Sequence, residues 1–283
     1  MDGNGISVLG GKLPRFLGQF DPFFASFKGR DNFERYVSGQ LSGLQRKSIE
    51  PMADAIDVCP RRMQLFLSHH RWDEERVRDK IQKIVVRKFS SDENIGIIDE
   101  TSFPKKGNET ACVQRQYCGA TGKTDNCVVS VHLAYATEDF HTLIDATPYL
   151  PRSWDEDPNR REKAVIPDSV VYRSLPEIAV EQLRRAQLNG VSFDWITADA
   201  GYGKSPAFVG FLEESAQAYV VEVPAIMTGW IQRPGVLEEE GDVLLRDEFG
   251  GDDEVTLVFA AFVIDNDDEL ASGKVLDGVF DAI

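Results

Sequence analysis

Residues 94–104, NIGIIDETSFP, decide the fold, because a short apolar run there ends in two acidic residues. The run is β-branched and too short for a helix, which predicts a central β-strand with Asp99 at its end and Glu100 on the opposite face. Residues 193–205, FDWITADAGYGKS, repeat this design, with Asp199 followed by a glycine-rich turn. Only a folded sheet could bring Asp99 and Asp199 together, at one edge.

Such an acid pair is a candidate metal site. Adjacent carboxylates repel each other, and a site that keeps both ionised usually does so by holding a divalent cation. Oxygen ligands suit Mg²⁺ or Mn²⁺. Nucleases and polymerases use two such ions to bind one phosphodiester group during the reaction. Asp99 and Asp199 are therefore candidate catalytic residues and metal ligands. Because Asp after a strand is also ordinary turn chemistry, the acids alone leave two unrelated turn residues as an alternative.

The bulk composition is that of a soluble globular protein of one large domain or two, with 283 residues, 42% hydrophobic and 28% charged. The longest apolar run, residues 255–264, is too short to span a membrane, and the N-terminus lacks the pattern of a signal peptide. The cytoplasm is the expected compartment. Four cysteines without a CxxC pair favour free buried thiols over zinc.

The net charge of −16 argues against a nucleic-acid partner, since phosphate contacts need Lys and Arg. The charge is unevenly distributed, however. Residues 238–283 hold 15 acids and two bases, a charge of −13, which leaves −3 for the first 237 residues. The acidity is mostly a property of this tail, and basic residues cluster before it.

The first 90 residues are expected to be helical. Apolar residues at three- and four-residue spacings predict helices over 31–45, 48–55, 60–67 and 73–89, and the lead-in to residue 28 holds a short helix at most. Short helices with tight turns and Arg-rich faces suit a helix-turn-helix-like DNA-binding module. They equally suit any small helical bundle.

The rest of the chain predicts a mixed sheet with helices on its faces. Strands are expected over 113–117, 128–135 and 140–145, the first two joined as a hairpin by the glycine-rich residues 119–125. A helix over 175–189, the Asp199 strand, a helix over 206–217 and a strand over 218–223 follow. The polar connection over 151–167 is of a length that is usually functional or disordered.

Several motifs together resemble a known family. IIDETSFPKKG (97–107), VQRQYCGATGKTDNC (113–127), PYLPRSWDEDPNRREKA (148–164) and WITADAGYG (195–203), in this order and spacing, look like the catalytic domain of bacterial insertion-sequence transposases of the DDE superfamily. The resemblance covers about residues 15–230. It implies an RNase H-like fold that cuts and rejoins DNA with an Asp, Asp, Glu triad, in which Asp99 and Asp199 are the first two acids. It also implies two Mg²⁺ ions and action on transposon ends as a possible homo-oligomer.

This resemblance sets the expected domains. They are a helical, DNA-binding region over 1–90, an incomplete RNase H-like catalytic domain over 91–232 and a divergent acidic tail over 233–283. The third acid should be a Glu on a late helix, but the pattern is lost near Arg233, and Glu248 and Glu254 are weak substitutes. We therefore expect a truncated, catalytically incomplete chain. A non-catalytic DNA-binding remnant or regulator of transposition is the alternative.

Six basic residues are candidate DNA contacts. Lys105 and Lys106 follow the first acid and could contact a phosphate or equally lie in a solvated turn. Arg115 is on a strand and could contact DNA or pair with an acid. Contact with DNA is favoured for four residues of the long connection, namely Trp154, Arg160, Arg161 and Lys163.

A nucleotide-binding enzyme is a rival interpretation. Residues 201–205, GYGKS, end like a phosphate-binding loop, but Ala198 stands where that loop needs Gly. Ser205 and Pro206 are better explained as the start of a helix. The four histidines, among them His132, have no expected role beyond packing or the surface.

Overall fold

A computed structural model describes residues 11–91 and 93–224 and, beyond these, the backbone of five short strands. The chain divides into two compact units, Met1–Ile84 and Val85–Ile283, which are described separately. The division falls within helix α6 (Glu74–Phe89). In the described part of the chain, no helix is long and apolar enough to cross a membrane.

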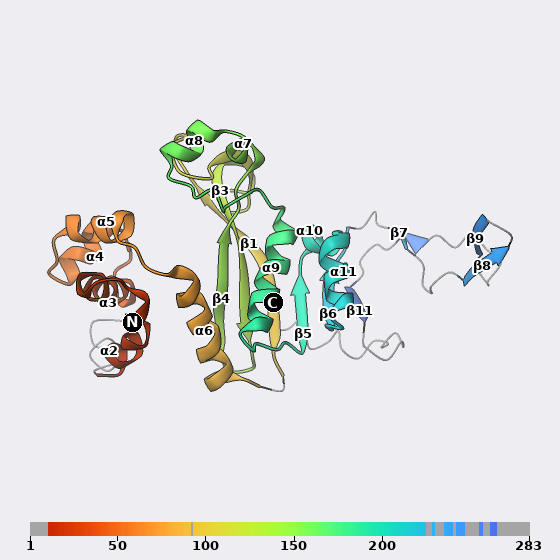
Figure 1. Ribbon diagram of the computed structural model, residues 1–283, viewed down its shortest axis with the longest axis horizontal. Helices are drawn as coiled ribbons and strands as arrows, with labels where there is room; N and C mark the ends of the chain where they lie inside the picture. Colours follow the sequence, from red (N-terminus) through yellow and green to blue (C-terminus); the bar gives the residue numbers. More distant parts are fainter. Residues whose placement is uncertain are drawn as a thin grey trace. The chain divides into compact units, whose positions relative to one another are not determined.

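The first unit is helical, as the spacing of apolar residues predicted (Figure 1). Its elements are α2 (Lys12–Leu17), the 3-10 helix η1 (Gly18–Phe23), α3 (Phe27–Leu41), α4 (Ile49–Ala55), α5 (Pro60–His69) and most of α6. Helix α3 begins four residues before its predicted start, because the Ser26 hydroxyl caps it by accepting a 3.1 Å hydrogen bond from the Gly29 amide. An aromatic core joins η1, α5 and α6 through Phe20, Phe66 and Ile84.

The second unit is built on a mixed sheet, which confirms the predicted α/β fold class. Its strands are β1 (Ile95–Pro104), β2 (Gln114–Cys118), β3 (Lys123–Ala136), β4 (His141–Pro148), β5 (Trp195–Ala198), β6 (Tyr219–Glu222) and β11 (Ala261–Ile264). The order is β11-β6-β5-β1-β3-β2, and β4 also pairs with β3. β5 runs parallel to both β1 and β6, whereas β1 and β3 are antiparallel. This is the RNase H-like arrangement expected from the sequence.

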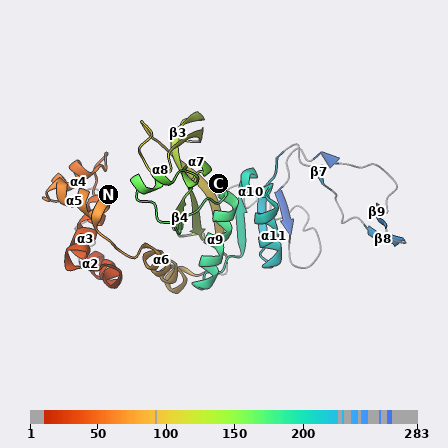
Figure 2. The same ribbon diagram turned by 45° about the horizontal axis from the view of Figure 1, so that its top comes forward.

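Helices α9 (Leu175–Leu188) and α11 (Pro206–Glu214) cover one face of this sheet (Figures 1 and 2). They bury Leu183 and Phe208 against alternate strand residues such as Ile98, Leu133 and Ile196. Val85 in α6 belongs to the same core. Helix α9 begins in a capping box in which Ser174 and Glu177 bond each other's backbone amides. The buried core therefore lies on the helical side of β1 and β5.

The polar connection after β4 is ordered and carries two short helices, α7 (Arg152–Asp155) and α8 (Pro158–Lys163). Trp154 is 1% exposed, and its indole N–H donates a 2.7 Å hydrogen bond to the Val113 carbonyl oxygen. It packs with Val113 and Leu150 in a small core of its own. The expectation that Trp154 contacts DNA was wrong, because this tryptophan is a structural anchor.

Beyond residue 224 only short strands are described. β8 (Gly235–Glu239) pairs with β9 (Asp242–Arg246), and β7 (Thr228–Gly229) pairs with β10 (Val255–Thr256). The strand predicted over 256–264 corresponds to the end of β10 and to β11, with 257–260 outside the described residues. The proposed substitute acids Glu248 and Glu254 also lie outside the described residues. The four cysteines are free thiols, and Cys118 and Cys127 are buried whereas Cys59 is exposed.

Candidate active site

Asp99 and Asp199 follow two residues that are paired in the sheet. Ile98 of β1 lies opposite Ala198 of β5 in a parallel ladder, and both side chains are buried in the core under α9 and α11. Since successive strand residues point to opposite faces, the next residue of each strand turns away from that core. Asp99 and Asp199 are both exposed. The two acids are therefore neighbours at one end of the parallel pair.

A backbone amide holds one oxygen of each carboxylate. Asp199 is the N-cap of the short helix α10 (Ala200–Gly203), and its Oδ1 accepts a 2.8 Å hydrogen bond from the Gly201 amide. Oδ1 of Asp99 accepts a 2.7 Å hydrogen bond from the amide of Glu100. These contacts orient the two carboxylates and use one oxygen of each. The second oxygen of each has no hydrogen bond to any described residue.

Glu100 faces the helical side of the sheet, as strand alternation predicted. Its Oε2 accepts a 3.0 Å hydrogen bond from the hydroxyl of Tyr202, which is 1% exposed. Burial raises the pKa of Glu100, the Tyr202 hydrogen bond lowers it, and the charges of Asp199 and Asp99 raise it further. Burial raises the pKa of Tyr202 far above its ordinary value, and the negative charge of Glu100 is the second cause. The tyrosine thus stays a protonated donor to Glu100.

His132 of β3 lies directly opposite Asp99 across the β1–β3 ladder. Its Nε2 is 2.6 Å from the Ser130 hydroxyl oxygen. Burial lowers the pKa of the imidazole, although the negative charge of Asp99 acts to raise it. The other ring nitrogen, Nδ1, is buried and has no hydrogen-bond partner among the described residues. The sequence interpretation gave His132 no part in this site, because only the strand register makes it a neighbour of Asp99.

The face of the sheet that carries these acids is open. Ile97 of β1 is 37% exposed and Leu143 of β4 is 55% exposed, although both strands belong to the main sheet. They line a groove of about 920 Å³ that also includes Ala134, Ala136 and Trp195. No helix between residues 93 and 224 covers this groove. The acids therefore lie on an accessible sheet surface with an apolar floor beside them.

Comparison with known proteins identifies the family. Residues 22–243, well over half of the chain, match the family described as DDE superfamily endonuclease. The chain belongs to the DDE superfamily endonucleases. It is also similar to a probable transposase for insertion sequence element IS701 from Microchaete diplosiphon, with 30% identity over 208 residues. The matched region is 72% of this chain and 51% of that relative, so the chain spans about half the relative's length.

The acids of this DDE endonuclease family member fit part of a metal site. Asp99 and Asp199 offer the hard carboxylate oxygens that Mg²⁺ and Mn²⁺ prefer. Within residues 11–91 and 93–224, however, no group of three or more His, Cys, Asp or Glu side chains is arranged to hold an ion. The two aspartates alone would leave most coordination positions to water, phosphate oxygen or a further protein ligand.

The glycine-rich turn of this DDE protein does not have the geometry of a phosphate-binding loop. The Gly201 amide is engaged by Asp199. A Cβ at Gly203 would lie 1.9 Å from the carbonyl oxygen of Glu222, so this glycine permits α10 to approach β6 closely. Ser205 is the N-cap of α11 and Pro206 its first residue, as predicted. The nucleotide-binding alternative therefore has no structural support.

Three of the predicted DNA contacts are exposed beyond the end of β1. Lys105, Lys106 and Arg115 all face solvent. The Lys105 amide donates a 2.8 Å hydrogen bond to the carbonyl oxygen of Asn126, and Asn126 pairs with Arg115 across the β2–β3 ladder. The Asn126 side chain also donates a 2.6 Å hydrogen bond to the Gly107 carbonyl oxygen. Lys105 and Lys106 thus lie on a loop that is held by hydrogen bonds, and Arg115 lies on a strand.

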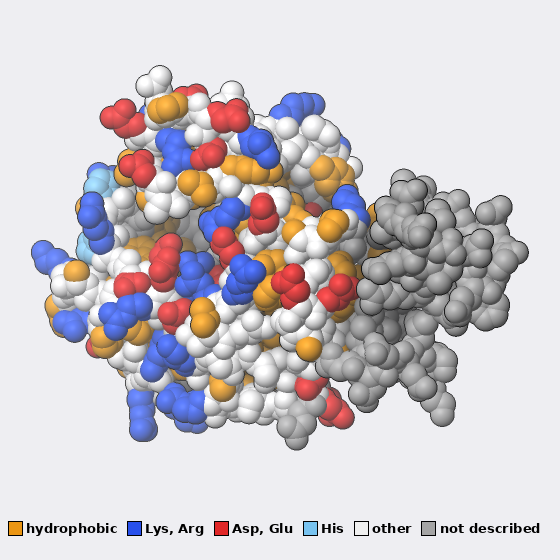
Figure 3. Space-filling model, turned by 45° about the vertical axis from the view of Figure 1, so that its right-hand side comes forward, with side chains coloured by type: hydrophobic (Ala, Val, Ile, Leu, Met, Phe, Trp, Pro, Cys, Tyr) orange, Lys and Arg blue, Asp and Glu red, His pale blue; other side chains and the backbone are white. Residues whose placement is uncertain are grey.

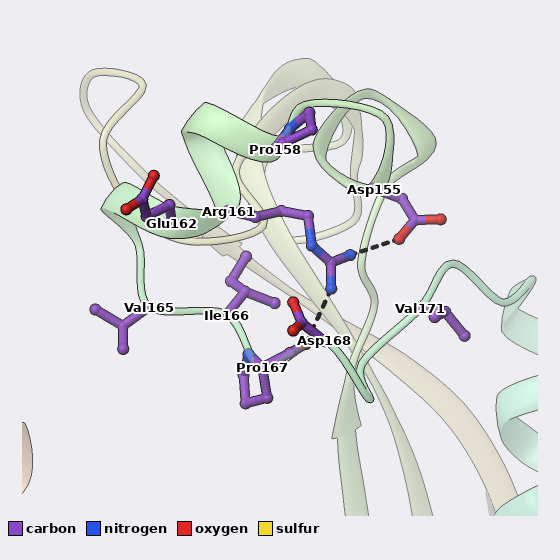
Figure 4. A pocket seen from close by; sticks show the side chains of 9 residues that line it. All are labelled: Asp155, Pro158, Arg161, Glu162, Val165, Ile166, Pro167, Asp168 and Val171. Carbon is purple, nitrogen blue, oxygen red and sulfur yellow. Dashed lines mark hydrogen bonds and ion pairs between the residues drawn. The ribbon is translucent and has the colours of Figure 1, made fainter.

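Arginines 160 and 161 of the DDE protein are used inside the fold. The Arg160 guanidinium lies 3.7 Å from the centre of the Trp154 ring and donates to the Asn108 and Val113 carbonyl oxygens. Arg161 is paired with Asp155 at 2.5 Å, and its side chain is 12% exposed (Figure 4). It also donates to the carbonyl oxygens of Pro167 and Val170 and lines a pocket of about 660 Å³.

Lys163, in contrast, is exposed at the end of α8 and pairs with the equally exposed Glu109. Figure 3 shows Lys and Arg side chains interspersed with Asp and Glu over the visible face of the described residues. The net charge of −16 therefore does not make this face uniformly acidic.

Proposed function

We propose that this chain is the DNA-handling and metal-binding part of an insertion-sequence transposase, which cuts and joins DNA at the ends of its element. The observation that carries the proposal is the pairing of Ile98 with Ala198, because it makes neighbours of two aspartates on an open sheet face. Membership of the DDE superfamily endonucleases and the similarity to a probable IS701 transposase give the reaction class.

Asp99 and Asp199 would hold the cation through the carboxylate oxygens that the backbone amides leave available. A divalent ion held there supplies charge stabilisation and activation of the attacking oxygen in phosphodiester cleavage. Tyr202 and Glu100 hold the turn after Asp199 against β1, which orients the two aspartates. His132 lies opposite Asp99 in the ladder, but its Nε2 contacts Ser130 and its Nδ1 is buried, so we assign it no proton transfer.

The exposed basic residues would position the DNA. Lys105 lies six residues beyond Asp99, a distance of about 20 Å at the rise of a β-strand. One base pair of duplex DNA rises about 3.4 Å, so these lysines would meet phosphates about six base pairs from the cut. We assign phosphate contacts to Lys105, Lys106, Arg115 and Lys163. Arg160 and Arg161 instead stabilise the fold around α7 and α8, because their guanidinium groups already donate hydrogen bonds to backbone carbonyl oxygens there.

The decisive experiment measures Mn²⁺ binding and DNA nicking by the purified chain, with Asp99→Asn and Asp199→Asn as test variants. We expect one Mn²⁺ to bind, detected by electron paramagnetic resonance, and each variant to lose it together with any nicking. Asp139→Asn, at an exposed turn between β3 and β4, is the matched control and should behave like the wild type. Wild-type metal binding in both aspartate variants would contradict the proposal.

A second function is favoured by one observation. Because the described residues contain no group of three acidic or other metal ligands, the chain could bind transposon DNA without cutting it. Duplex binding with no Mn²⁺-dependent nicking, by wild type and Asp99→Asn alike, would support this DNA-binding regulator. In either case the proposed partners are DNA and further copies of the chain, and the proposed compartment is the cytoplasm, where bacterial DNA lies.

A further inference from the structure

Residues of β1 and β2 share one face of the sheet beyond Asp99. Each of four side chains lies directly opposite an even-numbered residue of β3. The pairs are Asp99 with His132, Phe103 with Val128, Arg115 with Asn126, and Tyr117 with Thr124. Directly opposite residues point to the same face, and successive strand residues alternate between faces. These four side chains therefore lie on the face opposite the buried core residues Val131 and Leu133.

The same ladders give the spacing of this row. Phe103 lies four residues beyond Asp99 in β1, which is about 13 Å at the rise of a β-strand. Arg115 and Tyr117 lie opposite positions of β3 that are two and four residues beyond the partner of Phe103, about 7 and 13 Å farther along the sheet. The row therefore starts beside the candidate active site and leads away from it.

Two aromatic rings of this row are exposed. Phe103 is 44% exposed and Tyr117 is 67% exposed. Among the exposed large hydrophobic side chains of residues 93–224, only these two are aromatic. Within the same residues, neither ring belongs to a buried cluster or lies against another aromatic ring. Scattered apolar residues on a surface need no explanation, but two rings in one row on one face indicate a binding surface.

A cation lies between the two rings along β3. Arg115 is exposed, and no described residue forms an ion pair or a hydrogen bond with its guanidinium group. It lines a pocket of about 610 Å³ together with the acids Glu109 and Asp157. Glu109 is paired with Lys163, and Asp157 accepts a 3.0 Å hydrogen bond from the Arg160 amide in the first turn of α8. Arg115 can therefore contact an anion without breaking an ion pair of the described residues.

An aromatic ring, a cation and a second aromatic ring in one row fit a DNA strand whose bases are unpaired. In proteins that bind single strands, bases stack on aromatic side chains while basic residues contact the backbone phosphates. An intact duplex does not offer this contact, because each base pair is covered on both faces by its neighbours. The row therefore suits separated strands better than paired ones.

We propose that this face binds single-stranded DNA, with unpaired bases stacked on Phe103 and Tyr117 and the phosphates between them at Arg115. The inference rests on the proposed function, because it takes the DNA of the element end as the partner and names the state of that DNA. Since Phe103 is the ring nearer to Asp99, a strand that separates at the cut would reach Phe103 first. The binding itself requires neither the aspartates nor a metal ion.

The test compares two DNA probes on the full chain in EDTA, so that no metal-dependent cutting occurs. Fluorescence anisotropy measures the affinity for a single strand of about 20 nucleotides, longer than such surfaces usually cover, and for its duplex. Phe103→Leu and Tyr117→Leu should each weaken single-strand binding roughly fivefold or more and leave duplex binding unchanged. Phe103→Trp and Tyr117→Phe keep a ring and should keep the affinity. Phe27→Leu, at a 74% exposed ring of the first unit, is the matched control and should behave like the wild type.

Photocrosslinking of the wild-type chain decides the question even where a variant fails to fold. A single strand carrying 5-iodouracil should crosslink to Phe103 and Tyr117, identified by mass spectrometry, and the duplex should not. Absence of both crosslinks, or single-strand affinity that the leucine variants leave unchanged, would overturn the proposal. So would leucine variants that change self-association in sedimentation but not single-strand binding. A chain that binds no Mn²⁺ and nicks no DNA, with the single-strand results as expected, would count only against the proposed nuclease function.

Discussion

Tyr202 donates a 3.0 Å hydrogen bond to Glu100, and this bond ties the turn after one candidate catalytic aspartate to the residue after the other. Glu100 follows Asp99 in β1, and Tyr202 lies three residues beyond Asp199 in α10. The bond is made on the helical side of the sheet, whereas the aspartates lie on the open side. A contact within the core thus positions a site on the opposite face.

Removing the Tyr202 hydroxyl should weaken the fold. Tyr202→Phe leaves the partly buried Glu100 carboxylate without its donor, at a cost of about 1.5–3 kcal/mol in the free energy of unfolding. Urea denaturation of the metal-free protein measures this cost. In the double variant with Glu100→Gln, the loss should be smaller than the sum of the two single losses. Additive effects in this cycle would show that the two side chains are not coupled.

Gly203 should not tolerate a side chain. A Cβ there would lie 1.9 Å from the Glu222 carbonyl oxygen, so Gly203→Ala forces α10 away from β6 and should cost about 1–3 kcal/mol or more. Gly210→Ala is the matched control, because a Cβ at that position of α11 meets nothing within 4 Å. Alanine there should stabilise the helix by about 0.5–1 kcal/mol. Thermal melts that move both variants in the same direction would contradict this account.

The start of α9 should be sensitive to acid. Hydrogen bonds from Ser174 lower the pKa of Glu177 below its ordinary value of 4.5. A carboxyl group with a lowered folded-state pKa contributes stability above pH 4.5 and loses it as the pH falls through the folded value. Ser174→Ala should therefore cost about 1 kcal/mol at pH 7 and less at pH 3.5. Glu177→Gln should remove this pH dependence. An equal cost of Ser174→Ala at both pH values would contradict the expected contribution of ionised Glu177 to stability.

Neutralising the acidic segment should strengthen DNA binding. Residues 238–254 contain nine acids, which compete with phosphate for the basic residues. Replacing them by their amides should tighten non-specific binding and steepen its salt dependence. Substitution is a cleaner test than deletion, because β11 pairs with β6 and its removal would expose a sheet edge. Unchanged affinity and salt slope in fluorescence anisotropy would show that these acids do not act on bound DNA.

Much of the fold was predictable because its signals are local. The period of the α6 residues and the Ser205-Pro206 start of α11 each predicted an element close to its observed bounds. The prediction that β1 ends at Asp99 was wrong, because the strand stays paired with β3 as far as Pro104. The periodic residues predict a start of α3 that is four residues too late, because its cap, Ser26, lies before them. The sequence predicts no helix at α10, because four residues after a strand carry no periodic signal.

Of the candidate site, the sequence predicted the acidic residues but not the side chains that contact them. Strand alternation indicated the opposite directions of Asp99 and Glu100, but the partners of each depend on register, which is a long-range property. His132 became a neighbour of Asp99 only through the β1–β3 ladder. The polar segment around Trp154 and Arg161 predicts that both lie at the surface, although their buried contacts with Val113 and Asp155 hold that segment together.

The alternation of Asp99 and Glu100 has a consequence for how the gene can change. Loss of one codon among residues 95–98 would move Glu100 to the open face beside Asp199 and turn Asp99 into the apolar core, if the start of β1 kept its pairing with β5. If its end kept its pairing with β3, the residues before the deletion would change faces instead. Insertions and deletions in β1 would therefore be removed by selection, because each would turn residues of the site or of the core to the wrong face.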